Sequence, residues 1–579
     1  MNELKYLDIL QQNKELGVSS KSSPYSVTVL SNIIVHQIKE ILEFSLRGEG
    51  INANVEFGDY DNIIQDSEKY QDSDLIIIFW ELCNIVDGLQ FKVDILNESQ
   101  FDEIFEKIKF EIDFVLKNTH KTSFVLINKF TSLTFFGFNA KKGRFDKLAD
   151  RLNNYLEKKI LTNTALVEIN KVIASVGISN SLSLRQYYSS KSLYTIEFFK
   201  FYVEFIKPFI MAINGKSKKI IVFDCDNTLW KGVLGEDGFS KIEMSSREKN
   251  GSIFAEVQTM ALALNKQGIL IGLCSKNNLD DINEVIISHP DMQLKKDVIT
   301  IKKINWKDKV SNLQEIANEL NVGLDSLVFV DDSSFEVNLI REKLPEVTVL
   351  QVPKNIYEYP QMFRKNLNLF YNLSTTLEDN RRNKMYENQL KRESTKPSFV
   401  GIEDYLTSLE LKMTISENDK SIIPRMSQLS QKTNQFNLTT KRYTENDIKN
   451  FIDCQGVYVY TFSVSDKFGD SGITGLGIIS IFDDICTAKI DTFLMSCRII
   501  GRNIEYAFMD YIVKEIKNKK IKNLSAKYIK TRKNKQVEGF YDVCSFDVTS
   551  EDELSISYVL KVNEYKSKKI NYLEVISGK

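Results

Sequence analysis

Two aspartates separated by one residue follow a short apolar run in the segment IVFDCDNTLW, residues 221 to 230. The run predicts a β-strand, and the loop after it would turn the carboxylates of Asp224 and Asp226 towards a common point. Two hard oxygen ligands so close together suit Mg²⁺, which keeps several waters and shares its remaining positions with phosphate. Taken alone, the D-x-D pair is a weak signal.

Other apolar runs end in polar residues that suit phosphate chemistry. Asp331 and Asp332 end a second predicted strand and could complete the metal octahedron. Ser275 ends a third, where its hydroxyl could hold a phosphate oxygen. Lys309 begins a predicted helix and could neutralise charge on a transferring phosphoryl group. Because four separate signals coincide in chain order, the set predicts a site for phosphoryl transfer.

This ordered set resembles the active site of the haloacid dehalogenase superfamily. By that resemblance Asp224 is the nucleophile that attacks phosphorus, and Asp226 protonates the leaving oxygen and then activates water. The metal ligands are then expected to be Asp224, Asp226, Asp331 and Asp332. Side chains expected to contact the substrate are Thr228, Trp230, Lys276 and Asn277.

Longer motifs narrow the resemblance, which covers essentially the whole chain. Residues 224–230 and 232–238, together with INWKDK at 304–309 and QKTNQFNLT at 431–439, are similar to the FkbH-like family of glyceryl transferase/phosphatases. Members load a glyceryl unit from 1,3-bisphosphoglycerate onto the phosphopantetheine thiol of an acyl carrier protein and remove the 3-phosphate, for polyketide-type biosynthesis. The resemblance therefore implies Mg²⁺, 1,3-bisphosphoglycerate and a carrier protein as cofactor, substrate and partner.

The family reaction gives a possible role to Cys225, which lies between the two aspartates. A thiolate is a better acyl acceptor than a carboxylate or hydroxyl, so Cys225 could accept the 3-phosphoglyceryl group before the carrier thiol does. The alternative is a small apolar filler. Mg²⁺ and Lys309 would lower the pKa of the thiol, and the two carboxylates would raise it. The sequence therefore leaves open whether this pKa is raised or lowered.

The composition is that of an ordinary globular protein, with 42% hydrophobic and 27% charged residues. Lys and Arg number 76 against 78 Asp and Glu, which argues against nucleic acid as a partner. No apolar run is long enough to span a membrane, and the start of the chain lacks a signal-peptide core, so we expect no membrane partner and a cytoplasmic protein. The seven cysteines are scattered singly, without the spacing of a zinc site or a disulfide framework.

At 579 residues the chain is too long for one core, and its patterns predict three α/β domains. Strands alternate with helices in residues 1–215 and again in 216–375, which predicts two doubly wound parallel sheets. Residues 376–400 are a predicted helical connector with a solvated helix at 377–393. Longer strands around one long helix in residues 401–579 predict an α+β domain.

The flanking domains resemble known folds as well. The N-terminal domain is similar to SGNH hydrolases, with Ser31 as nominal nucleophile, but no Asp-x-x-His segment follows and we expect a docking or scaffold role. The C-terminal domain resembles N-acetyltransferases of the GNAT type. There Arg498, Gly501 and Arg502 at the start of the long helix could bind the phosphopantetheine of the carrier. The run 431–439 could fix an interface between domains or touch substrate.

Between Thr228 and Ser275 the sequence holds one short Gly-rich flap and one helical stretch, too little for a large cap over the site. An open site would admit a pantetheine arm. Two alternatives stay open: a phosphatase or transferase for another phosphorylated acyl group, and a carrier-docking scaffold with a vestigial site. The complete acidic set argues against the scaffold.

Overall fold

The computed structural model describes residues 4–19, 24–135, 141–373, 376, 378, 381–395, 399, 401–482, 486–531 and 533–578. The chain forms two compact units, Met1–Ile210 with Tyr443–Asn450 and Met211–Arg442 with Phe451–Lys579. Three sheets organise the described residues. The predicted multidomain α/β fold with parallel sheets is confirmed. No helix in the described residues is both long and apolar enough to cross a membrane.

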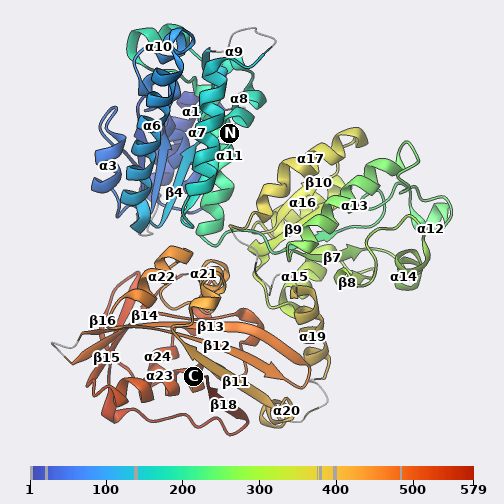
Figure 1. Ribbon diagram of the computed structural model, residues 1–579. Helices are drawn as coiled ribbons and strands as arrows, with labels where there is room; N and C mark the ends of the chain where they lie inside the picture. Colours follow the sequence, from blue (N-terminus) through green and yellow to red (C-terminus); the bar gives the residue numbers. More distant parts are fainter. Residues whose placement is uncertain are drawn as a thin grey trace. The chain divides into compact units, whose positions relative to one another are not determined.

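The N-terminal sheet is parallel throughout, in the order β2-β1-β3-β4-β5. All five residues of both β3 and β4 are buried, as expected for parallel strands covered by helices on both faces (Figure 1). Its strands are β1 (Tyr25–Ser31), β2 (Ala53–Phe57), β3 (Leu75–Phe79), β4 (Phe124–Asn128) and β5 (Thr164–Val167). Its longer helices are α1 (Tyr6–Ser19), α2 (Ile38–Gly48), α3 (Ile63–Lys69), α6 (Glu98–Asn118), α7 (Arg144–Lys159), α8 (Ile169–Val176) and α11 (Ile196–Ile213).

The helix after β1 starts later than its apolar pattern predicts. The pattern predicts a helix over Ile33 to Leu46, whereas α2 begins at Ile38. In the intervening loop the backbone N–H of Ile34 donates to the carbonyl of Lys191, and the Asn32 side chain bonds to the backbone of Glu81. Long-range hydrogen bonds therefore replace the first helical turn.

The central sheet is also parallel, in the order β10-β9-β6-β7-β8. Alternate residues of its middle strand enter two different cores: Ile221 and Phe223 pack with one helix pair, and Ile220 and Val222 pack with the other. The strands are β6 (Ile220–Phe223), β7 (Leu270–Ser275), β8 (Ile299–Ile304), β9 (Leu327–Asp331) and β10 (Thr348–Gln351). The first pair of helices is α13 (Gly251–Lys266) and α17 (Tyr359–Asn366), the second α15 (Lys309–Glu319) and α16 (Ser334–Lys343), and α12 (Leu234–Asp237) and α14 (Leu279–Ser288) complete the domain.

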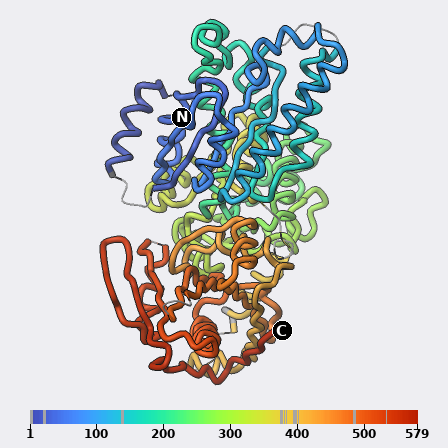
Figure 2. The backbone as a smooth tube through the Cα atoms, turned by 60° about the vertical axis from the view of Figure 1, so that its left-hand side comes forward, coloured from blue at the N-terminus to red at the C-terminus, as the bar shows by residue number. Residues whose placement is uncertain are grey.

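The C-terminal sheet has eight strands in the order β16-β17-β15-β14-β13-β12-β11-β18. Most neighbours are antiparallel, and the long hairpins appear in orange and red in Figure 2. The strands are β11 (Leu411–Glu417), β12 (Val457–Asp466), β13 (Gly469–Phe482), β14 (Thr487–Met495), β15 (Asn523–Ile529), β16 (Asp547–Glu551), β17 (Ser555–Lys561) and β18 (Leu573–Ser577). The helices include α20 (Ile402–Ser408), α21 (Ile423–Lys432), α22 (Glu445–Asp453) and the long α23 (Ile504–Asn518).

The helix predicted as a solvated connector is instead partly buried. It is α19 (Arg382–Thr395), and the first residues of the predicted span, 377 and 379–380, lie outside the described residues. The guanidinium of Arg392 is buried and bonds to both carboxylate oxygens of Asp466, at 2.7 and 2.9 Å. Tyr386 joins the second core of the central domain. The charged composition of this segment misled the prediction because Arg392 is buried in an ion pair with Asp466, a residue far along the chain.

Candidate active site

The carboxyl ends of three adjacent strands bring the predicted catalytic residues together. Phe223 of β6 pairs with Val330 of β9, so the next residues, Asp224 and Asp331, lie side by side. Lys309, the first residue of α15, reaches both: its Nζ lies 2.6 Å from Asp224 Oδ1 and 2.7 Å from Asp331 Oδ2. All three side chains are buried. One ammonium thus bridges two carboxylates at the carboxyl edge of the sheet, where parallel α/β sheets place their sites.

Three carboxylates form a group that could hold a metal ion. One oxygen each of Asp224, Asp331 and Asp332 lies within 4.8 Å of the others. Hard oxygen donors at this separation fit a cation such as Mg²⁺, and the bridging ammonium of Lys309 shows that the group accommodates positive charge. Burial, with the charge of Asp331, raises the pKa of Asp224 to about 7 despite Lys309, and the pKa of Asp332 is raised for the same reasons.

Asp226 lies outside this metal group, although it was predicted as a fourth ligand. Its Oδ1 accepts hydrogen bonds from the indole of Trp230 at 3.0 Å and the backbone N–H of Leu234 at 2.9 Å. Its Oδ2 accepts one from the amide of Asn277 at 2.7 Å. Trp230 is fully buried, so its side chain orients Asp226 and is not exposed to a substrate. The sequence could not show this role of Trp230, because it depends on a hydrogen bond from the indole to Asp226, four residues earlier in the chain.

Ser275 and Thr228 supply hydroxyls near the carboxylates. Ser275 ends β7, is buried, and accepts a 3.4 Å hydrogen bond from the Asn277 amide. The hydroxyl of Thr228 is buried and has no hydrogen-bond partner among the described residues. An unsatisfied buried hydroxyl costs free energy unless something binds it, which agrees with the predicted contact of Thr228 to substrate.

Glu336 is a site residue that the sequence argument missed. Lys276, predicted to contact substrate, forms a 2.6 Å ion pair with its carboxylate, and the second oxygen of Glu336 is buried without a partner. The backbone N–H of Glu336 also bonds to the hydroxyl of Ser333, which caps α16. A serine followed three residues later by glutamate, directly after Asp331 and Asp332, is a helix-start signal that could have identified it.

Cys225 is near the carboxylates but points into the core. Its side chain is fully buried in the same hydrophobic cluster as Phe223 and Trp230. Burial and the charges of Asp224 and Asp226 raise the pKa of this thiol well above its ordinary value, while Ser275 and Lys309 act in the opposite direction. The sequence left open whether the pKa of Cys225 is raised or lowered, and in this structure it is raised.

The predicted phosphopantetheine residues do not join the carboxylate site. Arg502 is buried: it bonds to Gln389 at 2.9 Å and lies 3.4 Å from the Asp466 carboxylate. Gly501 has a φ of +83°, which suits glycine, and α23 begins only at Ile504. Arg498 is buried too and lines a separate cavity described below.

The amide-rich run at 431–439 completes the C-terminal sheet. Strands β14 and β15 pair only through Thr487–Lys489 and Asn523–Ser525. Further along, backbone bonds tie Phe436 and Leu438 to β14, and Leu438 also accepts a bond from Ile529 of β15. The segment therefore fills the gap between two strands that diverge.

The N-terminal domain does not assemble a hydrolase triad around Ser31. Its hydroxyl donates to the carbonyl of Ile33 at 2.7 Å. His36 instead packs against the ring of Phe57, with 4.8 Å between ring centroids. The docking or scaffold role of this domain stays a prediction.

Glu81, two residues beyond β3, makes this domain sensitive to pH. It is buried, accepts a 2.8 Å hydrogen bond from Tyr194, and burial raises its pKa from 4.5 to about 7. The folded state thus holds this proton more tightly, so its stabilising effect is complete below pH 4.5 and is lost as the pH rises to 7. The loss amounts to roughly 3 kcal/mol. Glu81→Gln is expected to unfold at higher urea concentration than the wild type at pH 8, with a smaller difference at pH 5.

Urea titrations of both proteins at these two pH values measure the effect. Exposed Glu68 provides the matched control, since Glu68→Gln should follow the wild type at both. A constant difference between Glu81→Gln and the wild type from pH 5 to 8 would show that Glu81 does not titrate in this range.

Comparison with known proteins supports the central part of this description. No family model and no curated protein matches the sequence. Among solved structures, the chain is similar to the N-terminal part of the protein BF1531 from Bacteroides fragilis, which contains a phosphatase domain and was crystallised with Mg. The identity is 25%, the match covers 64% of this chain and 100% of that chain, and the TM-score is 0.56. The two chains share a fold.

Several other solved structures resemble the C-terminal part more weakly. An N-acetyltransferase from Escherichia coli that acts on the alanine of ribosomal protein S18 is 12% identical, with 27% of this chain and 98% of that chain covered and a TM-score of 0.21. An N-acetyltransferase from Staphylococcus aureus is 13% identical, with 26% of this chain and 98% of that chain covered and a TM-score of 0.21. We therefore base the fold of this domain on its own strand order. Membership of the FkbH-like family stays a prediction.

Proposed function

We propose that this protein is a Mg²⁺-dependent enzyme that transfers the 3-phosphoglyceryl group of 1,3-bisphosphoglycerate to the phosphopantetheine thiol of an acyl carrier protein and removes the 3-phosphate. The observation that carries the phosphatase half is the buried arrangement of Asp224, Lys309 and Asp331 at the carboxyl edge of the central sheet. The structural likeness to a phosphatase-containing protein solved with Mg supports it. The glyceryl and carrier specificity comes from the sequence resemblance.

The side chains of the site can divide the phosphatase reaction into two displacements. A carboxylate oxygen of Asp224 attacks phosphorus, the bond to the 3-oxygen breaks, and that oxygen takes a proton from Asp226. Asp226 then removes a proton from water, the water oxygen attacks phosphorus, and inorganic phosphate leaves while the Asp224 carboxylate is regenerated. Trp230, Leu234 and Asn277 hold Asp226 in one orientation for both steps.

Lys309 and the neighbouring polar groups would stabilise the transferring phosphoryl group. Mg²⁺ held by Asp224, Asp331 and Asp332 would supply further positive charge at the phosphoryl oxygens. The ammonium of Lys309 already lies 2.6 Å from Asp224 Oδ1, so it would lie close to the negatively charged oxygens of a phosphoryl group under attack by this carboxylate. Ser275 and the unsatisfied hydroxyl of Thr228 are placed to donate to phosphoryl oxygens.

For the acyl step we propose Cys225 as the first acceptor. Its sulfur attacks the acyl carbon, the bond to the phosphate oxygen breaks, and phosphate leaves with the electron pair; the carrier thiol then attacks the thioester and restores the Cys225 thiol. The support is the position of Cys225 between Asp224 and Asp226, near Ser275 and Lys309. Two features oppose this role: the thiol is fully buried in the apolar core, and its pKa is raised. The proposed step therefore requires that the thiol turn towards the substrate and lose its proton as it attacks.

Exposed apolar side chains at the mouth of the site support a macromolecular substrate. The only helices between β6 and β7 are α12 and α13, and α13 packs on the sheet, so this part of the chain forms no large cap. Trp306, in the loop before Lys309, is 76% exposed, and Phe335, in the first turn of α16, is 69% exposed. Exposed apolar groups gathered at one edge are typical of interaction sites. The segments that follow β7, β8, β9 and β10 expose in turn Leu279, Trp306, Phe335 and Tyr357.

Intact mass spectrometry of the carrier tests the proposal directly. The protein is incubated with Mg²⁺, 1,3-bisphosphoglycerate and a carrier that bears phosphopantetheine. A glyceryl increment on the carrier is the expected result, and a phosphoglyceryl increment would mean transfer without phosphate removal. No increment, with phosphate still released from small phosphomonoesters, would leave a stand-alone phosphatase. All seven cysteines are free, as expected in the reducing cytosol where we place this reaction.

The replacement Cys225→Ser separates the two half-reactions. Serine is almost isosteric, so the core should keep its packing, but a hydroxyl is a far weaker acyl acceptor at neutral pH. Carrier loading is expected to fall by on the order of 100-fold or more, while phosphate release from a small phosphomonoester changes little. Loading at the wild-type rate would show that the acyl group passes directly from the acyl phosphate to the carrier thiol. The buried core residue Cys274, replaced by serine, is the matched control.

A further inference from the structure

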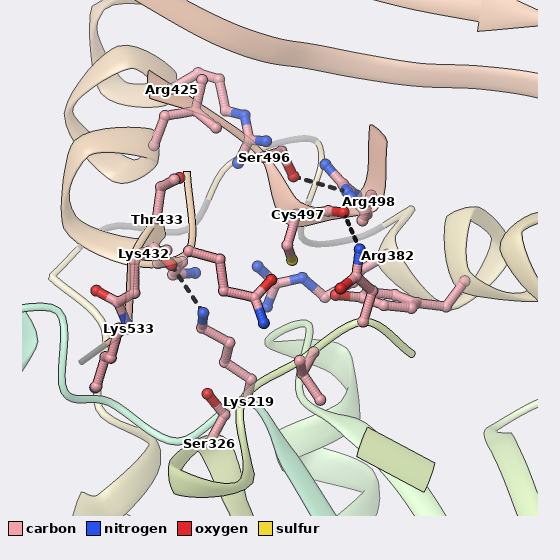
Figure 3. Close-up of a pocket in the computed structure, with 17 residues that line it drawn as sticks. Lys219, Ser326, Arg382, Arg425, Lys432, Thr433, Ser496, Cys497, Arg498 and Lys533 are labelled. Carbon is pink, nitrogen blue, oxygen red and sulfur yellow. Dashed lines mark hydrogen bonds between the residues drawn. The ribbon is translucent and has the colours of Figure 1, made fainter. Parts of the chain in front are cut away.

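A cavity of about 140 Å³ lies at the amino edge of the central sheet, away from the carboxylates. Lys219 directly precedes β6 and Ser326 directly precedes β9, whereas Asp224 and Asp331 lie at the other ends of these strands. The cavity is also lined by the end of α21 and by the turn that holds Ser496, Cys497 and Arg498 (Figure 3). It belongs wholly to one compact unit.

The lining of this cavity is strongly cationic. Among the described residues that line it there is no aspartate or glutamate, and the neutral polar side chains include Ser326, Thr433 and Ser496. Figure 3 shows the basic side chains converging from different elements of the chain. They are Lys219, Arg382, Arg425, Lys432, Arg498 and Lys533.

Two of these basic side chains lie close to a carboxylate. Lys533 forms an ion pair with Asp325, and Arg425 lies 3.7 Å from Glu378. Lys219 donates to the carbonyl of Lys432 at 2.8 Å. Arg498, which is buried, donates to the hydroxyl of Ser496 at 3.4 Å and to the carbonyl of Ser471 at 3.4 Å. In the part of the chain that the structure describes, Lys219 and Arg498 thus donate their hydrogen bonds to neutral atoms.

Gathering these basic side chains in one cavity costs free energy unless an anion binds among them. Positive charges removed from water repel one another strongly, and a paired anion offsets both costs. Accordingly, burial and then the charges of Arg382 and Lys533 lower the pKa of Lys219, although Cys497 and Asp325 oppose the shift. Burial also lowers the pKa of Arg498.

We propose that this cavity binds a phosphate-bearing anion at a site separate from the catalytic carboxylates. Guanidinium groups donate pairs of hydrogen bonds to phosphate oxygens, and ammonium and hydroxyl groups fill the remaining positions. The volume is about ten times that needed for a single water, which leaves room for one or two phosphoryl groups. Because the site lies at the opposite edge of the sheet, its ligand is not the phosphate that reacts. The proposal is independent of the proposed function.

Isothermal titration calorimetry of the full-length protein in EDTA, at constant ionic strength, tests it. Inorganic phosphate and pyrophosphate are titrated in parallel, and the tighter ligand shows whether the cavity takes one or two phosphoryl groups. Lys219→Gln is expected to weaken binding at least about tenfold, since each charge-assisted contact to phosphate is a strong one. Arg382→Gln, at the start of α19, is a second variant in case the first fails to fold.

The control is Lys412→Gln, since Lys412 is an exposed lysine of β11 outside the cavity and its replacement should bind like the wild type. Two results would overturn the proposal. One is the lack of saturable binding to the wild type. The other is binding that Lys309→Met abolishes and Lys219→Gln leaves unchanged, since the anion would then sit at the catalytic carboxylates.

Discussion

Replacing Asp224 with asparagine is expected to reduce phosphate release by on the order of 10³-fold or more, the scale on which loss of a covalent nucleophile acts. The amide keeps the shape of the carboxylate but cannot attack phosphorus. Stability should not fall with activity, because burial already raises the pKa of Asp224 and Lys309 keeps its contact with Asp331. Loss of activity in a folded protein would therefore report on chemistry.

Steady-state release of phosphate from a small phosphomonoester, with saturating Mg²⁺, measures this effect, and a thermal melt checks folding. The control is Glu284→Gln, the same change at an exposed position of α14. If Asp224→Asn kept a tenth of the wild-type rate, a different group would have to be the nucleophile, and Asp331 would be the next to test.

Replacing Lys309 with methionine is expected to cost both activity and stability. Methionine fills a similar volume but leaves Asp224 and Asp331 buried together without their shared cation. Removing one partner from a buried ion pair typically costs about 3–5 kcal/mol. We expect a loss of that order in the free energy of unfolding at pH 8 with EDTA, and a smaller loss when Mg²⁺ is added.

Urea denaturation of the wild type and two lysine variants measures this loss. Lys307, two residues earlier, forms a surface ion pair with Glu315, so Lys307→Met should change the free energy of unfolding by less than about 1 kcal/mol. Equal stability of the two variants would contradict the buried ion-pair arrangement. Phosphate release should fall in Lys309→Met alone.

The central domain was the most predictable part of the chain. Each strand that carries a catalytic residue reads as a continuous apolar run, because strands of a parallel sheet are buried on both faces. Polar residues at the ends of these runs must then meet at one edge of the sheet. Asp224, Ser275, Lys309 and Asp331 could therefore be placed from the sequence.

What the sequence could not give are the contacts that decide the role of each side chain. Nothing local to Trp230 shows that its indole bonds to Asp226, or that Asp226 thereby lies outside the metal group. The charged segment of α19 reads as solvated, yet Arg392 finds its partner Asp466 far along the chain. Both outcomes depend on tertiary pairing, which periodicity and composition do not encode.

The segment around Phe436 and Leu438 has a consequence for how the C-terminal domain folds. It must enter the sheet between β14 and β15, although these strands follow it in the sequence and Ile529 of β15 is one of its partners. Contacts between residues so distant in sequence raise contact order and slow folding. A fragment that began after this segment would leave diverging strand edges unpaired, and such edges invite aggregation. An autonomous C-terminal domain therefore has to begin before Phe436.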